Sequence, residues 1–206
     1  MSTSFFEVLK AEAPLKVFGT PSPLCALMAQ QAGFKAIYLS GGGLANYTYG
    51  VPDTGLTTLA NVVAEAEKIT RHKLITAPLL VDVDTGWDDP AHTARAMVEA
   101  GVKAIHIEDQ TEEKRCGHID GKSIITEAEM VTRLKESLKG RGESDLFIFA
   151  RTDATGEEAI ERAKAYAAAG ADGIFAEAVG ELADYKKFKQ AVDIPILANI
   201  TEFGKT

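Results

Sequence analysis

The stretch Glu-Ala-Gly-Val-Lys-Ala-Ile-His-Ile-Glu-Asp, residues 99–109, decides the fold. Its glycine, Gly101, is typical of the residue that closes an α-helix, and the apolar run after it predicts a short buried strand. Nearly the same junction occurs as Gln-Ala-Gly-Phe-Lys-Ala-Ile at 31–37 and as Ala-Ala-Gly-Ala-Asp-Gly-Ile at 168–174. This repetition predicts alternating helices and strands, which is the pattern of a parallel sheet.

β-rich runs recur along the chain between helical stretches. They cover residues 16–19, 36–40, 78–84, 104–109, 146–153, 173–177 and 195–201. At their carboxyl ends stand polar residues two apart, namely Tyr38 and Ser40, Asp82 and Asp84, His106 and Glu108, Arg151 and Asp153, and Asn199 and Thr201. Side chains two apart share one face of a strand, so in a barrel these groups would point to the axis. An open sheet would gather such groups at one switch point, so we predict an α/β fold of the (β/α)8 TIM-barrel type.

The predicted barrel lacks one strand. After the seventh run only residues 202–206 remain, which are too few for a further helix and strand. A barrel left open in this way would expose strand edges. We therefore expect a single partial barrel domain over residues 1–206, truncated after the seventh strand, with the eighth strand and the C-terminal helices missing.

Composition narrows the function classes. The 206 residues are 46% hydrophobic and 25% charged, as in ordinary globular domains, and the net charge of -8 argues against a nucleic-acid partner. The apolar runs are too short to cross a bilayer, and the N-terminal residues show no secretory signal, so we expect no membrane partner. Two cysteines in dissimilar surroundings do not form a disulfide framework, and a cytoplasmic location is expected.

One thiol lies among cationic neighbours in the stretch Lys-Arg-Cys-Gly-His, residues 114–118. Lys114 and a protonated His118 would favour the thiolate, which is the reactive form of cysteine. Gly117 leaves the backbone beside the sulfur small enough for a close approach by a ligand. We therefore predict a reactive thiol at Cys116.

Asp82 and Asp84 are candidate ligands of a magnesium ion. They share one strand face, and Mg²⁺ binds one or two carboxylates while keeping several waters. One of the two could instead only cap the helix that follows. Glu108 is expected in the outer shell of the ion, through water, and an ion pair with Arg151 or Lys114 is an open alternative.

Six short runs follow one another in order along the predicted strands and loops. They are Tyr-Leu-Ser-Gly-Gly-Gly (38–43), Val-Asp-Val-Asp-Thr-Gly (81–86), His-Ile-Glu-Asp-Gln (106–110), Lys-Arg-Cys-Gly-His (114–118), Ala-Arg-Thr-Asp-Ala (150–154) and Leu-Ala-Asn-Ile-Thr-Glu-Phe-Gly (197–204). With these runs the chain resembles the isocitrate lyase and phosphoenolpyruvate mutase superfamily, and within it the branch that cleaves 2-methylisocitrate. The cysteine run is the specific part. The pair Trp87-Asp88, and Ala176 before Glu177, depart from the usual pattern of the family.

The resemblance implies a Mg²⁺-dependent carbon–carbon lyase that splits 2-methylisocitrate into pyruvate and succinate by retro-aldol type chemistry. This reaction belongs to propionate catabolism, in the methylcitrate cycle. Isocitrate or 2,3-dimethylmalate as substrate, a phosphonopyruvate-type mutase or hydrolase, and an inactive truncated relic stay open as alternatives. The resemblance also implies a small tricarboxylate as the partner and a homo-oligomer, which is a tetramer in the family.

The resemblance further implies roles for single groups. Cys116 would protonate the carbanion that leaves as succinate, while Lys114 and His118 tune the thiol and bind substrate. Tyr38 would take the proton of the substrate hydroxyl, and His106 is an equally open candidate. Residues expected to bind substrate are Ser40, Gly41 and Gly42 as a carboxylate cradle or an ordinary glycine-rich turn, Arg151 as a bidentate partner, and Cys116, Gly117, Glu177, Asn199, Ile200 and Thr201.

Overall fold

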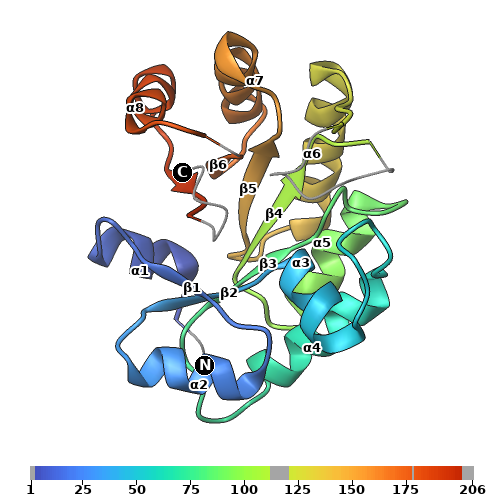
Figure 1. The fold of residues 1–206 in the computed structure, drawn as a ribbon, viewed down its shortest axis with the longest axis vertical. Helices are drawn as coiled ribbons and strands as arrows, with labels where there is room; N and C mark the ends of the chain where they lie inside the picture. Colours follow the sequence, from blue (N-terminus) through green and yellow to red (C-terminus); the bar gives the residue numbers. More distant parts are fainter. Residues whose placement is uncertain (1–2, 112–120, 178, 201–206) are drawn as a thin grey trace.

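A curled sheet of seven parallel strands forms the centre of the computed structural model, which describes residues 3–111, 121–177 and 179–200 (Figure 1). The strands follow one another in sequence order, and each pairs in parallel with the next. They are β1 (Val17–Gly19), β2 (Ala36–Leu39), β3 (Leu79–Asp82), β4 (Ala104–Glu108), β5 (Phe147–Thr152), β6 (Gly173–Ala176) and β7 (Ile196–Ala198). Each lies inside a predicted run. The predicted fold class, a TIM-type α/β barrel represented here by seven strands, is confirmed.

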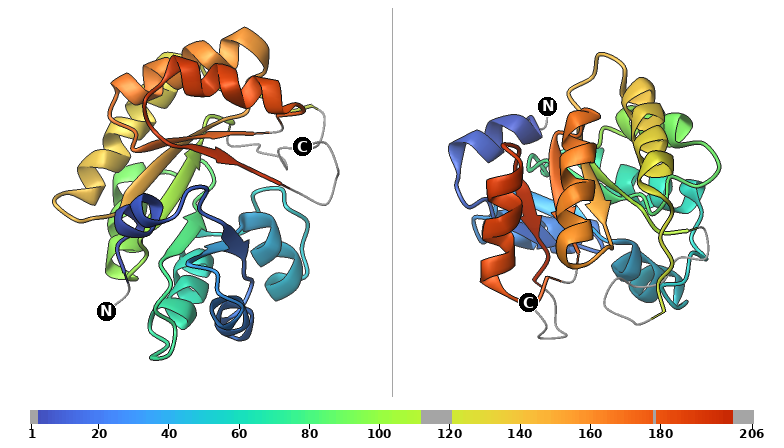
Figure 2. Two further views of the ribbon diagram at one scale, coloured as in Figure 1. Left: turned by 90° about the vertical axis from the view of Figure 1, so that its left-hand side faces the viewer. Right: turned by 90° about the horizontal axis from the view of Figure 1, so that it is seen from above.

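Helices lie between successive strands, and the longer ones cover the outer side of the curl, whereas the first helix precedes β1 and packs Phe5 into the inner apolar cluster (Figures 1 and 2). The helices are α1 (Phe5–Ala11), α2 (Pro23–Gln31), the short α3 (Gly41–Gly43), the π-helix η1 (Leu44–Tyr49), α4 (Leu59–Thr70), α5 (Pro90–Glu99), α6 (Glu127–Arg141), α7 (Gly156–Ala168) and α8 (Leu182–Ala191). In the part of the chain that the structure describes, no helix is long and apolar enough to cross a membrane.

The repeated junctions form as predicted. Gly33, Gly101 and Gly170 follow the ends of α2, α5 and α7 with φ of 96°, 77° and 104°. Positive φ of this kind is strained for residues that carry a Cβ, so glycine ends each helix and turns the chain into the next strand. At the start of α5, the Asp89 carboxylate accepts a hydrogen bond of 2.8 Å from the His92 backbone N–H.

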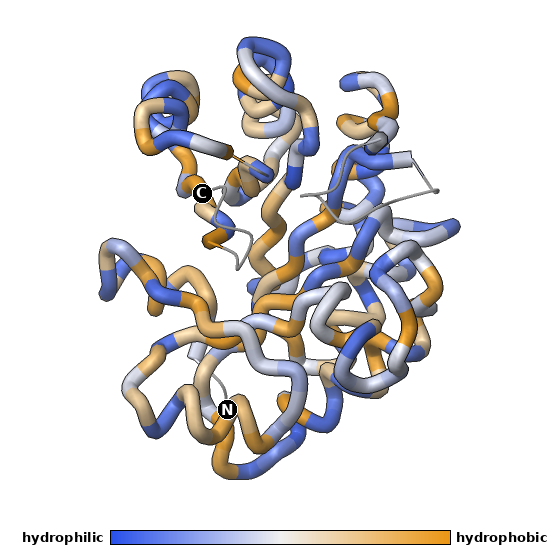
Figure 3. Tube along the Cα trace, viewed as in Figure 1, coloured by the Kyte–Doolittle hydropathy of each residue, from blue (hydrophilic) through white to orange (hydrophobic). Residues whose placement is uncertain are grey.

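Side chains alternate across the strands between two apolar layers. The outer layer packs against the helices and includes Ile37, Leu39, Leu79, Val81, Ile105, Ile107, Ile148 and Ile174. The inner layer fills the amino-terminal half of the curl and consists of Phe5, Ala36, Leu80, Ala104, Phe147, Phe149 and Phe175. Figure 3 colours each residue by its hydropathy, and both apolar and polar residues occur along the strands and the helices. Polar residues further along the inner face therefore lie above an apolar floor.

The sheet has two edges in the described residues, β1 and β7. Residues of β1 and β7 are half-buried or exposed, whereas every residue of β3, β4, β5 and β6 is buried. Phe18 in β1 remains 46% exposed. The assignment of residues 1–206 to a single partial domain that lacks the eighth strand and the C-terminal helices stays a prediction.

Gly173 makes room for the aromatic floor. A Cβ at this position would lie 2.5 Å from the ring of Phe149 and 3.0 Å from that of Phe147. Any larger residue would force these buried rings out of their packing. Gly19, in the edge strand β1, has no atom within 4 Å of the place where its Cβ would be.

These two glycines form a matched pair for a stability test. We expect Gly173→Ala to lower the free energy of unfolding by about 1–3 kcal/mol through overpacking, and Gly19→Ala to change it by less than about 1 kcal/mol. Urea unfolding followed by circular dichroism measures both. Equal effects of the two substitutions would contradict the packing of Phe149 against Gly173. Adding Phe149→Leu to Gly173→Ala should recover part of the loss.

Candidate active site

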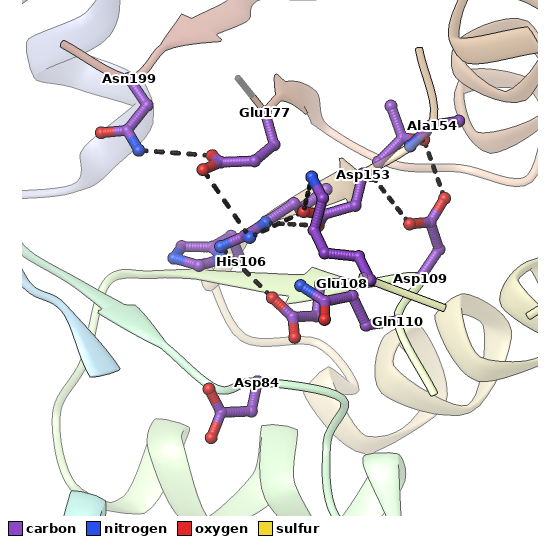
Figure 4. Close-up of polar contacts among 12 residues, drawn as sticks. Asp84, His106, Glu108, Asp109, Gln110, Asp153, Ala154, Glu177 and Asn199 are labelled. Atoms are coloured by element: carbon purple, nitrogen blue, oxygen red, sulfur yellow. Dashed lines mark hydrogen bonds and ion pairs between the residues drawn. The ribbon is translucent and has the colours of Figure 1, made fainter. Parts of the chain in front are cut away.

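Several of the polar residues predicted at the strand ends, among them His106, Glu108 and Asp84, lie together on the inner face of the sheet (Figure 4). The register places Asp82 of β3 beside His106 of β4, and Glu108 of β4 beside Arg151 of β5. All four are buried, as is Glu177, directly after β6. Sequence periodicity placed these residues on the axis, and the parallel pairing brings them to one end of the curl.

Asp82 and Asp84 converge beside the backbone of Gly41. Asp82 Oδ2 accepts from Gly41 N at 3.0 Å, and Asp82 Oδ1 accepts from Asp84 N at 3.0 Å. A Cβ on Gly41 would lie 3.0 Å from Asp82 Oδ2 and 3.2 Å from Asp84 Oδ1. Both carboxylates therefore face the same small volume, and a Cβ at position 41 would fit only if they shifted.

Asp84 has a strained backbone. Its φ of 48° lies in the left-handed region, and Trp87 in the same turn has a φ of 51°. The turn is closed by a hydrogen bond of 2.8 Å from Gly86 N to Val83 O, while Trp87 Nε1 donates to Thr57 O at 3.0 Å. Strained residues concentrate at functional sites, and this turn aims a carboxylate into the mouth of the curl.

The donor set fits a magnesium ion. Two buried carboxylates supply hard oxygen ligands, and Mg²⁺ needs no more from the protein because water fills its other positions. Residues 3–111, 121–177 and 179–200 contain no group of three or more His, Cys, Asp or Glu arranged to hold a metal. Asp82 and Asp84 are thus the residues that could hold the ion, with water completing its coordination.

Asp53 is a further carboxylate near this point that the sequence analysis did not identify. A Cβ on Gly42 would lie 3.0 Å from Asp53 Oδ2, so this side chain reaches the glycine turn after β2. Asp53 lies in the segment between η1 and α4, away from the strands. Strand periodicity therefore offered no signal for it.

Tyr38 and His106 form a hydrogen-bonded pair beside the aspartates. Tyr38 OH lies 2.9 Å from His106 Nε2, and the same nitrogen lies 3.6 Å from Asp82 Oδ1. Burial of the phenol, followed by the charge of Asp82, raises the pKa of Tyr38 well above its ordinary value, although Arg151 acts in the opposite direction. Tyr38 therefore keeps its proton in this structure.

Arg151 lies among the carboxylates of three strand ends. Its Nε and Nη2 donate to Asp153 at 2.8 and 3.1 Å, its Nη1 lies 3.3 Å from Glu108 Oε2, and its Nη2 lies 3.8 Å from Glu177 Oε1. Burial alone would lower the pKa of Arg151, but the three carboxylates raise it well above its ordinary value. The ion pair between Glu108 and Arg151, left open as an alternative above, is present.

Lys122 and Asp153 belong to the same network; Asp153 was predicted at a strand end without a role in the site, and Lys122 was not predicted. Lys122 Nζ donates to Asp153 Oδ1 at 2.9 Å. Burial would raise the pKa of Asp153, but Arg151 and Lys122 outweigh it and hold the pKa below its usual range. The two-residue spacing marked Asp153, whereas Lys122 follows no strand and gave no periodic signal.

Polar groups of the glycine turn after β2 already have partners within the protein. Ser40 Oγ accepts from Gly43 N at 2.9 Å and begins α3, while the N–H of Gly41 binds Asp82. Asn199 Nδ2 donates to Glu177 Oε2 at 3.3 Å and so joins the site, whereas Ile200 is 71% exposed and is not brought together with it. The remaining predicted site residues, Lys114, Cys116, Gly117, His118 and Thr201, lie outside the described residues.

Comparison with known proteins agrees with this geometry. The model of the family described as phosphoenolpyruvate phosphomutase matches residues 6–205. A 2-methylisocitrate lyase of Shewanella oneidensis is 49% identical, in an alignment that covers 98% of this chain and 71% of that protein.

Solved structures show the same relationship. The crystal structure of a 2,3-dimethylmalate lyase, a member of the phosphoenolpyruvate mutase and isocitrate lyase superfamily, superposes with a TM-score of 0.90 at 34% identity, covering 100% of this chain and 72% of that one. A phosphonopyruvate hydrolase in complex with oxalate and Mg²⁺ superposes with a TM-score of 0.76 at 26% identity, covering 87% and 65%. The resemblance found in the sequence is confirmed, and the chain belongs to the phosphoenolpyruvate phosphomutase family, in which it groups with carbon–carbon lyases.

Proposed function

We propose that the protein is a Mg²⁺-dependent lyase that cleaves 2-methylisocitrate into pyruvate and succinate. The observation that carries this proposal is the convergence of Asp82 and Asp84 with a charged, buried Arg151 at the carboxyl end of one parallel sheet. Such a site suits an anionic substrate that also binds a metal. The similarity to a 2-methylisocitrate lyase supports the choice of substrate.

The charges of the site support the need for a cation. Among the described residues, Glu108, Asp153 and Glu177 pair with Arg151 or Lys122, and Asp82 and Asp84 add two further carboxylates at the same end of the sheet. A tricarboxylate entering this arrangement would meet excess negative charge, which is costly where water is excluded. When bound at the aspartates, Mg²⁺ supplies positive charge that polarises the substrate hydroxyl and its neighbouring carboxylate.

Arg151 is the residue proposed to bind a substrate carboxylate. Its guanidinium stays charged, and its plane can offer two parallel N–H donors. Asp153 already accepts hydrogen bonds from Nε and Nη2. Nη1 lies 3.3 Å from Glu108, so a substrate carboxylate could replace Glu108 most easily at Nη1. Asn199 and Glu177 flank the same end of the sheet.

Tyr38 and His106 are proposed to take the proton of the substrate hydroxyl together. Because the pKa of Tyr38 is raised, a free tyrosinate is a poor base here. The phenol can accept the substrate proton while donating its own to His106 Nε2 at 2.9 Å, in the tautomer that accepts at Nε2. Breaking the carbon–carbon bond then leaves a carbanion on the succinate half, and the thiol of Cys116 is proposed to protonate it.

The assay that tests the function is Mg²⁺-dependent release of pyruvate from 2-methylisocitrate. We expect release that stops with EDTA, and a Cys116→Ser variant slower by a factor of about 10²–10⁴, as for loss of a proton donor. Isocitrate, 2,3-dimethylmalate and phosphonopyruvate serve as parallel substrates. Turnover of one of these alone would replace the proposed substrate, and no turnover of any in folded protein would contradict the lyase proposal.

Metal binding can be tested without turnover. We expect Asp84→Asn to weaken Mg²⁺ binding at least about 10-fold in isothermal titration, because one of two carboxylate ligands loses its charge. Asp88→Asn is the matched control, since Asp88 follows four residues later and is exposed. Equal affinities of both variants and the wild type would place the metal elsewhere.

The proton-transfer proposal predicts a selective loss in kcat. We expect Tyr38→Phe to lower kcat by about 10²–10³ while KM changes little, because the lost hydroxyl acts in the transition state. Tyr47→Phe, at a tyrosine that is 82% exposed, should leave both constants unchanged. A normal kcat in Tyr38→Phe would contradict the role of the phenol and leave His106 alone as the base.

A further inference from the structure

Asp109, directly after β4, is fully buried yet turns away from the site just described. Figure 4 shows its carboxylate directed toward the chain at Asp153 and Ala154, whereas that of Glu108 lies on the side of His106. Consecutive strand residues point to opposite faces, so Asp109 cannot share the role of Glu108. Its exposed fraction is 0%. The carboxylate has polar partners on two elements, β5 and α7.

Asp109 forms hydrogen bonds with the backbone on both sides of Thr152. Its backbone N–H donates to Arg151 O at 3.2 Å, and its Oδ1 accepts from Asp153 N at 2.8 Å. β5 ends at Thr152, so the N–H of Asp153 lies beyond the strand ladder. The carboxylate thus takes the place of a strand partner at the point where the sheet stops. Asp153 in turn holds the guanidinium of Arg151 by two hydrogen bonds.

The other carboxylate oxygen ties this clamp to helix α7. Asp109 Oδ2 accepts from Thr152 Oγ1 at 2.8 Å, from Tyr166 OH at 2.8 Å and from Arg162 Nη1 at 3.2 Å. Burial raises the pKa of Asp109, and the hydrogen bonds from Asp153 N, Thr152 and Tyr166 oppose that shift. Buried ion pairs add little stability over apolar packing, so geometry is the advantage that this arrangement offers.

We infer that Asp109 is a positioning residue for Arg151, acting through the backbone of Asp153 to hold the guanidinium at the height where a substrate carboxylate binds. The inference rests on the proposed function in that it takes Arg151 as the carboxylate partner. Asp109 itself touches no substrate. Its replacement should therefore impair binding of carboxylates more than its effect on stability accounts for.

Asp172 offers a matched control at the opposite end of β5. Its backbone N–H donates to Ile148 O at 3.0 Å, its Oδ2 accepts from Ile148 N at 2.9 Å, and Arg141 Nη1 lies 2.6 Å from the same oxygen. Like Asp109, it therefore braces β5 by its backbone and its carboxylate and binds an arginine of a neighbouring helix. It lies at the amino end of the strand, away from Arg151.

The experiment compares Asp109→Asn with Asp172→Asn in thermal unfolding, steady-state kinetics and titration with succinate as a dicarboxylate probe. We expect both variants to lose thermal stability. Asp109→Asn alone should raise KM and the Kd for succinate about 10-fold or more, since small misplacements of a binding group have effects of this size. Tyr166→Phe, which removes one donor to Asp109, should give a smaller change in the same direction if Asp109→Asn does not fold.

Crystal structures of the variants separate this inference from the proposed function. In Asp109→Asn we expect the contact of 2.8 Å between Arg151 Nε and Asp153 Oδ2 to be lost or displaced, and in Asp172→Asn to be kept. An unchanged Arg151 in Asp109→Asn, or equal KM and Kd values for the two variants, overturns the positioning role. A wild type without lyase activity overturns the proposed function only, because the position of Arg151 still decides this inference.

Discussion

The buried guanidinium of Arg151 is the interaction on which the mouth of this sheet depends. It joins the carboxyl ends of three adjacent strands, because Glu108 belongs to β4, Arg151 to β5, and Glu177 follows β6. Removing one partner of a buried ion pair destabilises a protein by about 3–5 kcal/mol, since the remaining charge has no water. The guanidinium also lies over the ring of Phe175, 5.3 Å from its centre, so the polar mouth rests directly on the aromatic floor. Geometry at this one residue links the fold to the site.

The division between floor and mouth follows from strand alternation. On the inner face, β5 reads Phe147, Phe149 and Arg151, and β4 reads Ala104, His106 and Glu108, so the charged residues Glu108 and Arg151 lie at the same height, while His106 lies beside Phe149. Parallel pairing in register is what makes these heights coincide. An antiparallel neighbour would reverse the order and place charges beside the floor. The apolar half excludes water from below, and electrostatic interactions in the upper half are strengthened as a result.

Strand periodicity predicts some residues of the site and gives no signal for others. The period of two placed Asp82, His106, Glu108 and Arg151 correctly, because strand geometry converts spacing into direction without further information. Asp53, Lys122 and Asp109 were missed for a different physical reason. Asp53 and Lys122 reach the site from loops, where spacing carries no direction, and Asp109 points away from the axis, so its contacts with Tyr166 and Arg162 depend on how α7 packs. The partner of Glu108 was left open as well, and the distance of 3.3 Å shows the ion pair with Arg151, whereas Lys114 lies outside the described residues.

The strained turn at Asp84 completes the argument for a metal at this mouth. A non-glycine residue at a φ of 48° raises the energy of the folded state, by about 1–3 kcal/mol for such conformations. What the conformation achieves is to bring a second carboxylate beside that of Asp82, with Gly41 leaving the space between them open. Two charged carboxylates that lie beside the same point in a buried site repel each other, so the strained backbone and the repulsion occur at the same place. A divalent cation between the carboxylates would relieve this repulsion. The strained turn would then place Asp84 in advance for binding the cation.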